Sequence, residues 1–407
     1  MADAPGYLAA YLDTLMSGAE RDETIAALAE ILGFRKPHLG FVAQGELPLG
    51  FGSNLKFGNF RRRRVAKTRI RAPRLILPNL YMNSSNEAAT GANATVRGAF
   101  EQNGQTVTAT FSGLASGTAL NGAFIVSDPV EAVDIAAGSV YWERGNGSYP
   151  GGLPYGTKNA PNINGGDCFE YGATALTDRT DAVGAFTSSD STNSFATLGT
   201  VAMTCDPSIF HLGDSTTQGE GETAPTDDTG LTGFTKILGQ FFGSFNAGIG
   251  SATAAGFIAS ARTNRTALAN TYATHLFQGH TLNMLGDSLA KMQADLLAER
   301  NLFPNLLAYL MTTPPSGQVN DGTPANQAPG ANESKRVALN DWKRLCPSAW
   351  SGCIDIADIF EVNAAGVKTR NGGRYPAGMS ADMLHPTPAG YLMAKNAGGH
   401  LRSVISA

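Results

Sequence analysis

The spacing of hydrophobic residues changes twice along the chain, and each change predicts a different kind of structure. Up to Gly33, apolar residues recur three and four positions apart, as in Tyr7, Leu8, Tyr11, Leu12 and Leu15. This spacing is typical of one face of an amphipathic helix, and a glycine such as Gly33 is a typical helix end. We therefore predict a helix over residues 1–33. Residues 34–60 are rich in glycine and proline and are predicted to form an irregular linker arm.

Between residues 61 and 205 the hydrophobic period becomes two. Turn dipeptides such as Asn103-Gly104 and Asn121-Gly122 separate several of the alternating runs. Period two is typical of half-buried strands, and these dipeptides favour tight hairpin turns. Strands are expected at 68–71, 74–77, 95–100, 106–111, 123–126 and 139–144, with a long surface loop at 145–164. The pattern predicts an all-β sandwich module of the jelly-roll kind.

After Pro207, short apolar runs alternate with helical patterns. Strands are predicted at 209–212, 274–277, 306–311 and 353–356, and helices at 232–242, 288–300 and 332–345. Such alternation implies an α/β domain with a parallel sheet and helices on both faces. Ligands of these sheets bind beyond the carboxyl ends of the strands, so catalytic residues should follow strands. The predicted domains are therefore 1–60, 61–205 and 206–407.

Composition restricts the partners of this chain. It has 407 residues, of which 42% are hydrophobic and 16% charged, with a net charge of −4. The length fits two or three packed domains, and the charge gives no reason to expect nucleic acid. Within the basic run at 61–74, Lys67, Arg69 and Arg71 alternate. We interpret them as a solvated strand face or a domain seam, with a patch for an anionic polymer as the alternative.

No stretch approaches the roughly 20 apolar residues of a membrane span, so a soluble protein is predicted. The first residues show no secretory signal, which leaves the compartment open, including secretion or a cell or particle surface. The cysteines also leave it open. Cys346 with Cys353 and Cys168 with Cys205 could form disulfides, and four buried free thiols are an equally good interpretation. We predict no metal and no cofactor, because neither metal-ligand spacing nor a phosphate-binding glycine loop occurs.

The first chemical signal is Gly213-Asp214-Ser215, which ends an apolar strand and precedes a helical segment. A serine hydroxyl needs exposure and an adjacent base to act as a nucleophile. A strand-to-helix turn supplies the exposure and presents the serine N–H as a donor for an oxyanion. A second copy, Gly286-Asp287-Ser288, leads straight into a helix, so we interpret Ser288 as a helix cap.

The second signal is Asp382-Met-Leu-His385-Pro386, close to the carboxyl end. The base for a serine is an imidazole whose other nitrogen is held by a carboxylate. Aspartate and histidine three residues apart in a turn can form that pair. An isolated Asp-x-x-His is more often ordinary surface, but its place behind the Gly-Asp-Ser strand favours catalysis. We interpret His211 as a core histidine with satisfied hydrogen bonds, and we expect His275 and His280 to pack or to bond the backbone.

Four blocks, taken in order over residues 207–407, resemble the SGNH hydrolases of the GDSL type. They are Gly213-Asp-Ser with Gly219, Asn246-Ala-Gly-Ile-Gly-Ser-Ala-Thr253, Thr281-Leu-Asn283-Met284 and Asp382-x-x-His385-Pro386. The resemblance implies a flavodoxin-like α/β fold and an esterase with Ser215 as nucleophile, His385 as base and Asp382 as its orienting carboxylate. It also implies an oxyanion hole made by the N–H groups of Ser215 and Ser251 and the amide of Asn283.

This sequence departs from the family pattern at three places. Ser251 stands where the family usually has glycine, and Gly250 is the alternative donor if the register shifts by one. Thr281 and Met284 replace the usual glycine and aspartate of the third block.

The resemblance suggests short-chain or acetyl esters as substrates, with an acylated polysaccharide as the substrate class to test. The alternative is a non-catalytic binding or structural protein of a surface or phage particle, with a degenerate SGNH scaffold. Thr281 and Met284 favour that alternative, whereas intact Ser215, Asp382 and His385 oppose it. The helix at 1–33 is a candidate contact for a homo-oligomer.

Overall fold

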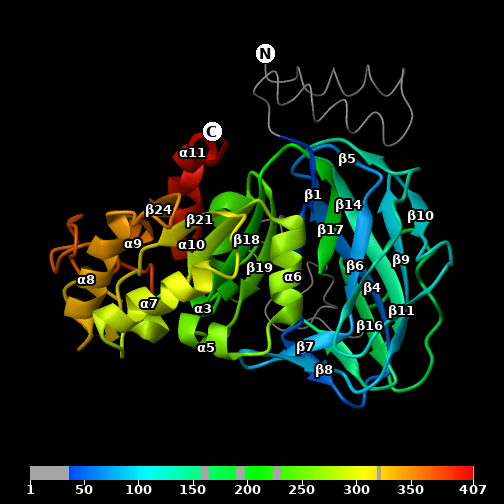
Figure 1. Ribbon diagram of the computed structural model, residues 1–407, viewed down its shortest axis with the longest axis horizontal. Coiled ribbons are helices and arrows are strands. Elements are labelled where there is room, and N and C mark those ends of the chain that lie inside the picture. Colours follow the sequence, from blue (N-terminus) through cyan, green and yellow to red (C-terminus); the bar gives the residue numbers. More distant parts are fainter. Residues whose placement is uncertain (1–35, 157–164, 189–197, 223–230, 319–321, 407) are drawn as a thin grey trace.

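The computed structural model describes residues 36–156, 165–188, 198–222, 231–318 and 322–406. The helix predicted at 1–33 lies outside the described residues. Figure 1 shows two halves side by side, with antiparallel strands on the right and a helix-covered sheet on the left. No helix in the described ranges is long and apolar enough to cross a membrane.

The sheet of the left half has six strands, and every neighbouring pair runs parallel. Their order is β2 (Gln44–Glu46), β19 (Gly243–Gly248), β18 (Ser208–Gly213), β20 (His275–Gly279), β21 (Leu307–Met311) and β24 (Gly352–Ile354). All residues of β18, β19 and β20 are buried. The four predicted strands are confirmed, each with ends within two residues of the prediction.

Helices cover both faces of this sheet. One hydrophobic cluster joins Phe210 and Leu276 of the sheet to α6 (Thr263–Tyr272), α7 (Leu289–Arg300) and α8 (Glu333–Arg344). Another joins Ile209 and Phe277 to α4 (Lys236–Gly239), α9 (Ile356–Phe360) and α10 (Pro388–Ala397). The predicted helices at 288–300 and 332–345 are confirmed as α7 and α8. The one predicted at 232–242 is shorter, a 3₁₀ turn (Gly233–Thr235) followed by α4.

Two antiparallel sheets pack face to face in the other half. One has the order β1 (His38–Phe41), β17 (Gly199–Thr204), β6 (Arg74–Pro78) and β12 (Phe124–Val126). The other has the order β10 (Gln105–Ala109), β9 (Ala94–Gln102), β14 (Val140–Ser148), β4 (Phe57–Val65) and β16 (Cys168–Gly172), with β11 (Gly117–Ala119) beside β9. Leu75 and Leu77 of the first sheet and Phe60 and Tyr141 of the second belong to one buried cluster between them.

Four short strand pairs complete the described strands: β3 (Gly50–Gly52) with β15 (Leu153–Tyr155), β5 (Ile70–Arg71) with β13 (Asp134–Ile135), β7 (Leu80–Asn83) with β8 (Asn86–Ala89), and β22 (Gly317–Gln318) with β23 (Ala328–Pro329). The hairpin β7–β8 connects the two halves. Glu87 on this hairpin accepts hydrogen bonds at 2.8 Å from the backbone N–H groups of Asn264 and Arg265, in the first turn of α6. A carboxylate there satisfies N–H groups that lack partners within the helix.

The predicted linker arm at 34–60 is wrong, because this segment forms β1, β2, β3 and the start of β4. β1 joins an antiparallel sheet, whereas β2, three residues later, joins the parallel sheet. Its glycines allow close strand contact rather than turns. A Cβ added at Gly45 would lie 2.2 Å from the carbonyl oxygen of Leu198, and one at Gly40 would lie 2.9 Å from Cβ of Ser208.

The surface loop predicted at 145–164 is also wrong over its described part. β14 continues to Ser148, and β15 follows at Leu153–Tyr155. Here too the glycines make room for neighbours, because a Cβ at Gly145 would lie 2.4 Å from the ring of Phe60. Glycines therefore have two roles in this stretch, because Gly145 makes room for a neighbouring ring whereas Gly151 and Gly152 lie in the turn between β14 and β15.

The basic run at 61–74 divides into a buried part and an exposed part. Arg61, Arg62 and Arg64 are buried, and each pairs with a glutamate, respectively Glu101 at 2.7 Å, Glu46 at 3.3 Å and Glu143 at 2.9 Å. The pair of Arg62 with Glu46 of β2 crosses the seam between the halves. Arg69 is exposed, Arg71 is partly buried, and both pair with the exposed Asp134, which agrees with a solvated face. All four cysteines are free thiols.

Candidate active site

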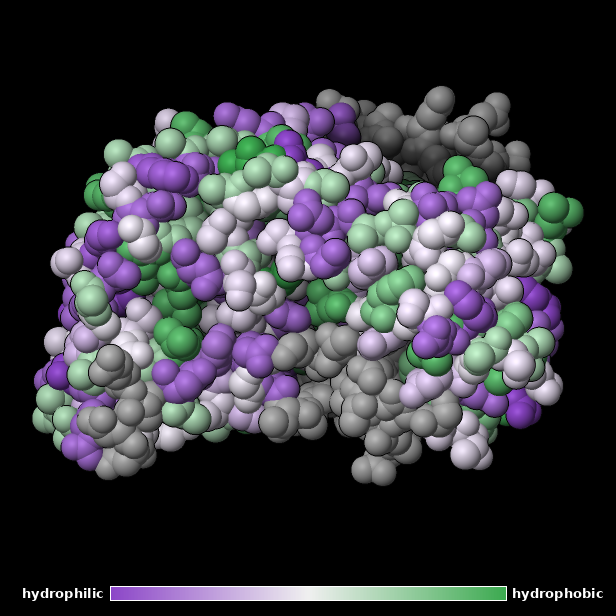
Figure 2. Space-filling model, turned by 90° about the horizontal axis from the view of Figure 1, so that it is seen from below, coloured by the Kyte–Doolittle hydropathy of each residue, from purple (hydrophilic) through white to green (hydrophobic). Residues whose placement is uncertain are grey.

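Ser215 begins a short helix at the carboxyl end of the central strand β18. Asp214 caps this helix, α3 (Ser215–Gln218), and Gly219, with φ of 102°, ends it by donating its N–H to the carbonyl of Ser215. The turn is so tight that a Cβ at Gly213 would lie 2.2 Å from Oγ1 of Thr217. Ser215 keeps 9% of its surface exposed, although its helix is otherwise packed into the structure. Figure 2 views the molecule from the side on which α3 lies, where hydrophilic and hydrophobic residues are interspersed.

Asp382 and His385 form a second tight turn before α10. One carboxylate oxygen of Asp382 accepts the backbone N–H groups of Leu384 at 2.8 Å and His385 at 2.7 Å. The other oxygen lies 2.6 Å from Nδ1 of His385. Partial burial raises the pKa of Asp382, but its hydrogen bonds with His385 and Leu384 outweigh this and lower the pKa below its ordinary value. The carboxylate therefore stays charged and orients the ring.

The two turns meet although 170 residues separate them in sequence. Nε2 of His385 lies 2.9 Å from Oγ of Ser215. The loop after α3 packs against the histidine turn, because a Cβ at Gly221 would lie 3.2 Å from Cβ of His385. The hydroxyl of Tyr391 in α10 donates to the carbonyl of Glu220 in the same loop at 2.8 Å. A carboxylate, an imidazole and a serine hydroxyl are thus in a continuous contact chain, which can move a proton from the hydroxyl to the ring.

The predicted second and third blocks lie on turns adjacent to Ser215. The N–H of Ile249 donates to the carbonyl of Gly213 at 3.0 Å, which holds the turn of Ser251 beside the turn of Ser215. Ser251 has φ of 63°, in the left-handed region that favours glycine, and its side chain is exposed. This backbone conformation explains why a glycine would suit the position. Gly250 does not have a positive φ.

Asn283 lies in a 3₁₀ turn, Leu282–Met284, after β20. Its side-chain amide donates to the carbonyl of Ala252 at 3.2 Å, and the residue is exposed. No described residue accepts the second N–H of this amide. Among the described residues, the backbone N–H groups of Ser215 and Ser251 donate to no protein acceptor. These donors lie on three neighbouring turns at one edge of the sheet.

No role for Asp214 is predicted from the sequence, but in the structure it links the turn of Ser215 to the turn of Asn283. It is fully buried and accepts hydrogen bonds from Thr216 on its own turn and from Thr281 and Leu282 on the turn of Asn283. A signal for this was present in the sequence. Position 281 of the third block holds a threonine in place of the family's usual glycine, and a threonine hydroxyl can donate a hydrogen bond to a carboxylate.

Comparison with known proteins finds likeness only at the level of solved structures. No protein-family model matches the sequence, and no curated protein matches it. A structure described as a peptidoglycan O-acetylesterase is 10% identical, with 85% of this chain and 77% of that chain covered and a TM-score of 0.37. Esterase EstA from Pseudoalteromonas sp. is 20% identical, with coverages of 47% and 93% and a TM-score of 0.31.

A third similar structure is Est24, a carbohydrate acetylesterase from Sinorhizobium meliloti. It is 14% identical, with 49% of this chain and all of that chain covered and a TM-score of 0.32. This chain is similar to several solved structures that are described as esterases.

The second Gly-Asp-Ser copy has the predicted structural role. The side chain of Ser288 accepts the N–H of Lys291 at 3.3 Å and caps α7, which confirms the cap. Ser215 and Ser288 therefore offer a matched pair, with the same three-residue context and different surroundings.

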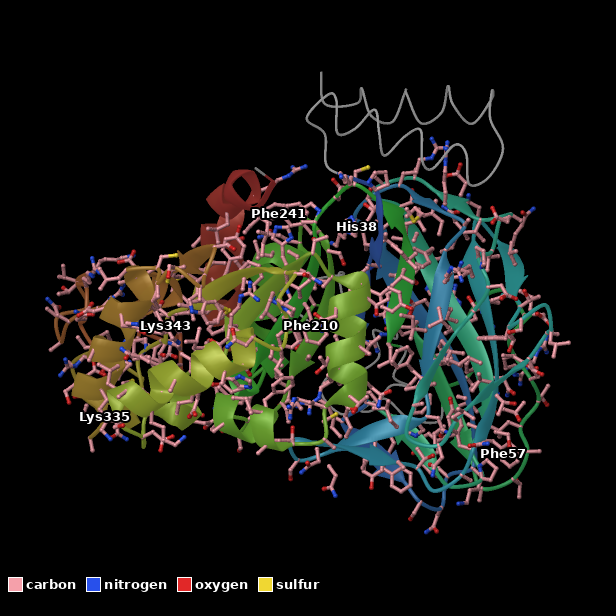
Figure 3. All side chains as sticks on the ribbon, viewed as in Figure 1. His38, Phe57, Phe210, Phe241, Lys335 and Lys343 are labelled. Carbon is pink, nitrogen blue, oxygen red and sulfur yellow. The ribbon has the colours of Figure 1, made fainter. Side chains whose placement is uncertain are left out.

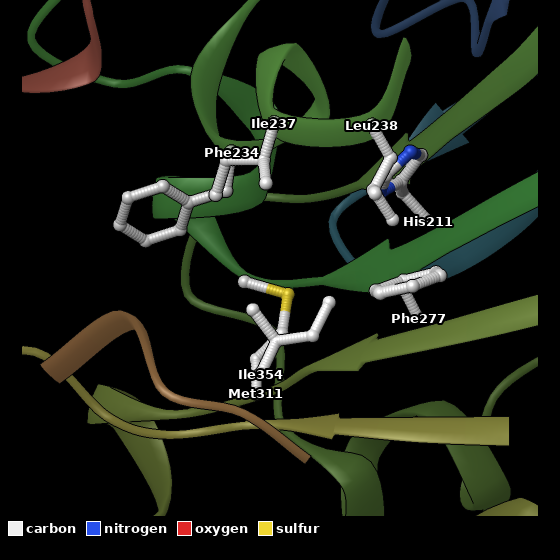
Figure 4. A pocket seen from close by; sticks show the side chains of 7 residues that line it. All are labelled: His211, Phe234, Ile237, Leu238, Phe277, Met311 and Ile354. Atoms are coloured by element: carbon white, nitrogen blue, oxygen red, sulfur yellow. The ribbon is translucent and has the colours of Figure 1, made fainter. Parts of the chain in front are cut away.

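His211 is buried as predicted, but the prediction that its hydrogen bonds are satisfied is wrong. Neither ring nitrogen has a hydrogen-bond partner in the described part of the chain, and burial lowers its pKa to about 3. It faces the apolar side chains that line a small pocket (Figure 4), namely Phe234, Ile237, Leu238, Phe277, Met311 and Ile354. Nδ1 of His275 lies 2.7 Å from Oγ1 of Thr274, and Nδ1 of His280 lies 2.8 Å from a carboxylate oxygen of Glu299. Both histidines thus contact polar side chains, whereas we expected packing or hydrogen bonds to the backbone. The described ranges contain no cluster of three or more side chains that could ligate a metal.

Proposed function

We propose that this protein is a serine esterase that uses Ser215, His385 and Asp382 as a triad. One observation supports this most strongly: the unbroken contact chain from Asp382 to His385 at 2.6 Å and from His385 to Ser215 at 2.9 Å. Serine, histidine and aspartate in this order convert a weak nucleophile into a strong one, whatever the fold.

The reaction has two steps in this proposal. His385 takes the proton of Ser215 as the hydroxyl oxygen attacks the ester carbonyl, and the protonated ring then gives that proton to the leaving alcohol. The acyl group stays on Ser215. A water molecule, deprotonated by His385, attacks the acyl carbon, and the acid leaves as Ser215 regains its proton. The charge of Asp382 stabilises the imidazolium that forms in each step.

Three donors would hold the negative charge that develops on the carbonyl oxygen. They are the backbone N–H groups of Ser215 and Ser251, with Gly250 as the alternative to Ser251, and the side-chain amide of Asn283. The lack of protein acceptors for the two N–H groups within the described residues supports this assignment. Donors that are already in place before the reaction stabilise the transition state far more than water does, because water must reorient as the charge forms.

We propose short-chain or acetyl esters as substrates, carried by a carbohydrate such as an acylated polysaccharide. The four blocks that resemble SGNH hydrolases support this class. The openness of the site also supports a large substrate, because half of the Asp382 side chain is exposed and so is the neighbouring Leu384. The rival is a non-catalytic surface or particle protein, and Thr281 and Met284 are the residues that favour it.

Turnover of p-nitrophenyl acetate, propionate and butyrate, together with acetate release from an acetylated polysaccharide, tests the proposal. Ser215→Ala should lower kcat by roughly 10³–10⁶ with the fold intact. Ser288→Ala is the matched control and should leave kcat within twofold. Asn283→Ala should lower kcat roughly 10²–10³-fold, as for a single oxyanion donor. A folded wild-type protein without turnover would support the rival, and activity that survives Ser215→Ala would refute the triad.

A further inference from the structure

Hydrogen bonds link the three turns around Ser215 into a closed ring. The turn after β18 is linked to the turn after β19 by the bond from Ile249 N–H to Gly213. The turn after β19 is linked to the turn after β20 by the bond from Asn283 to Ala252. The third link runs from the turn after β20 back to the turn after β18, through Asp214.

Asp214 makes this third link with one oxygen for each turn. Oδ1 accepts the N–H and the hydroxyl of Thr216 at 3.0 and 2.8 Å. Oδ2 accepts the N–H and the hydroxyl of Thr281 at 3.0 and 2.9 Å and the N–H of Leu282 at 3.2 Å. Both Asp214 and Thr281 are completely buried, so water cannot replace a missing donor.

The three donors to Oδ2 lie immediately before Asn283 in the chain. Asn283 itself is exposed, and within the described residues its side chain has one hydrogen bond, to the carbonyl of Ala252. Its position relative to Ser215 therefore depends on the segment Thr281–Leu282, which the carboxylate of Asp214 holds. Catalytic groups need to be held within about 0.5 Å of their productive geometry, and supporting hydrogen bonds provide this.

We propose that Thr281 is a positioning residue for the reaction. Its hydroxyl, bonded to Asp214, holds the amide of Asn283 in place as an oxyanion donor. This inference rests on the proposed function, because it assumes that Asn283 stabilises the oxyanion. It also gives the unusual residue at position 281 a use in catalysis, whereas a degenerate scaffold would give it none.

Kinetics of variants at position 281 test the proposal. Thr281→Val keeps the shape of the side chain and removes the donor, and should lower kcat of p-nitrophenyl acetate about tenfold with KM within twofold. Thr281→Ser keeps the hydroxyl and should restore kcat to within about threefold of wild type. Thr312→Val is the matched control. Thr312 also follows a strand of the parallel sheet, is completely buried and donates to an aspartate, Asp355, at 2.9 Å. It should leave kcat within twofold.

A double-mutant cycle separates positioning from stability. If Thr281 acts through Asn283, adding Thr281→Val to Asn283→Ala should lower kcat by less than twofold, because the group to be positioned is gone. A full tenfold further loss in that background would overturn the proposal. So would an unchanged kcat in Thr281→Val alone, or equal losses in Thr281→Val and Thr312→Val.

Thermal unfolding of each variant checks the fold. Thr281→Ala removes the same donor should Thr281→Val not fold, and if neither folds, Thr281 serves stability and the proposal is wrong. Failure of the proposed function has a different signature, since activity would then survive Ser215→Ala. Activity that needs Ser215 and Asn283 but is indifferent to Thr281 would overturn this inference alone.

Discussion

His211 makes the stability of this protein sensitive to acid. Its ring is 1% exposed, and neither nitrogen has a hydrogen-bond partner in the described ranges. Burial without a partner disfavours the charged ring, which lowers the pKa of His211 from 6.5 to about 3. The folded protein therefore keeps this ring neutral where an unfolded chain would already bind a proton.

Proton linkage gives the direction and the size of the change in stability with pH. Because the folded pKa is the lower one, stability is fully present above about pH 6.5 and is lost as the pH falls toward 3. Each pKa unit corresponds to about 1.4 kcal/mol, so the complete loss is about 5 kcal/mol. Between pH 7.5 and pH 4, the part due to His211 is about 3 kcal/mol.

His211→Leu removes the titrating group and leaves an apolar side chain beside an apolar pocket. Urea unfolding of wild type and variant at pH 7.5 and pH 4 measures the effect. The variant should be more stable at pH 7.5 by about 1–2 kcal/mol, because no unpaired polar group is buried. Its advantage should grow by about 3 kcal/mol at pH 4. Equal pH dependence of the two proteins would refute the reasoning, since His211 would then have a partner or reach water.

Two further substitutions test other strained or buried groups. Burial lowers the pKa of Lys343 on α8, labelled in Figure 3, to about 8. Its amine donates to the carbonyl of Met311 at 2.8 Å. The neutral amine costs the folded state nothing above about pH 10.5, and the free energy of unfolding falls as the pH drops toward 8 because the buried amine must then take up a proton. In urea titrations at pH 7, the free energy of unfolding of Lys343→Met should therefore be about 2 kcal/mol higher than that of wild type. The difference should shrink by about 2 kcal/mol at pH 9.5, while Lys335→Met on the same helix should change stability by less than about 0.5 kcal/mol. Ser251→Gly should raise the free energy of unfolding by about 0.5–1 kcal/mol, because a serine at φ of 63° is strained. A higher melting temperature would show this gain. Its kcat should stay within twofold, and a larger loss would mean that the side chain takes part in the reaction.

The parallel sheet could be predicted because its strands are short, mainly apolar runs that alternate with helical patterns. Residues 208–213 and 275–279 are buried throughout, as expected for strands covered by helices on both faces. The turn after each such strand then had to lie at one edge. This is why Ser215 and Asn283 could be proposed as neighbours before their contacts were known.

Short or glycine-rich strands could not be predicted in the same way. β2 has three residues, Gln44-Gly-Glu46, two of them polar, and it pairs with β19 while its Glu46 forms a buried pair with Arg62 of the other half. Pairs of this kind join distant positions, and no local pattern reveals them. The sequence also could not predict whether the ring of His211 has a hydrogen-bond partner, because a buried histidine has the same sequence pattern with or without one.

Labelling with a fluorophosphonate probe, followed by peptide mapping with mass spectrometry, tests the central claim most directly. The probe reacts only with a serine that an adjacent base activates. We predict one adduct on Ser215 in wild type and in Ser288→Ala, and none in Ser215→Ala. An adduct on Ser288, or none on a folded wild-type protein, would contradict the triad of Ser215, His385 and Asp382.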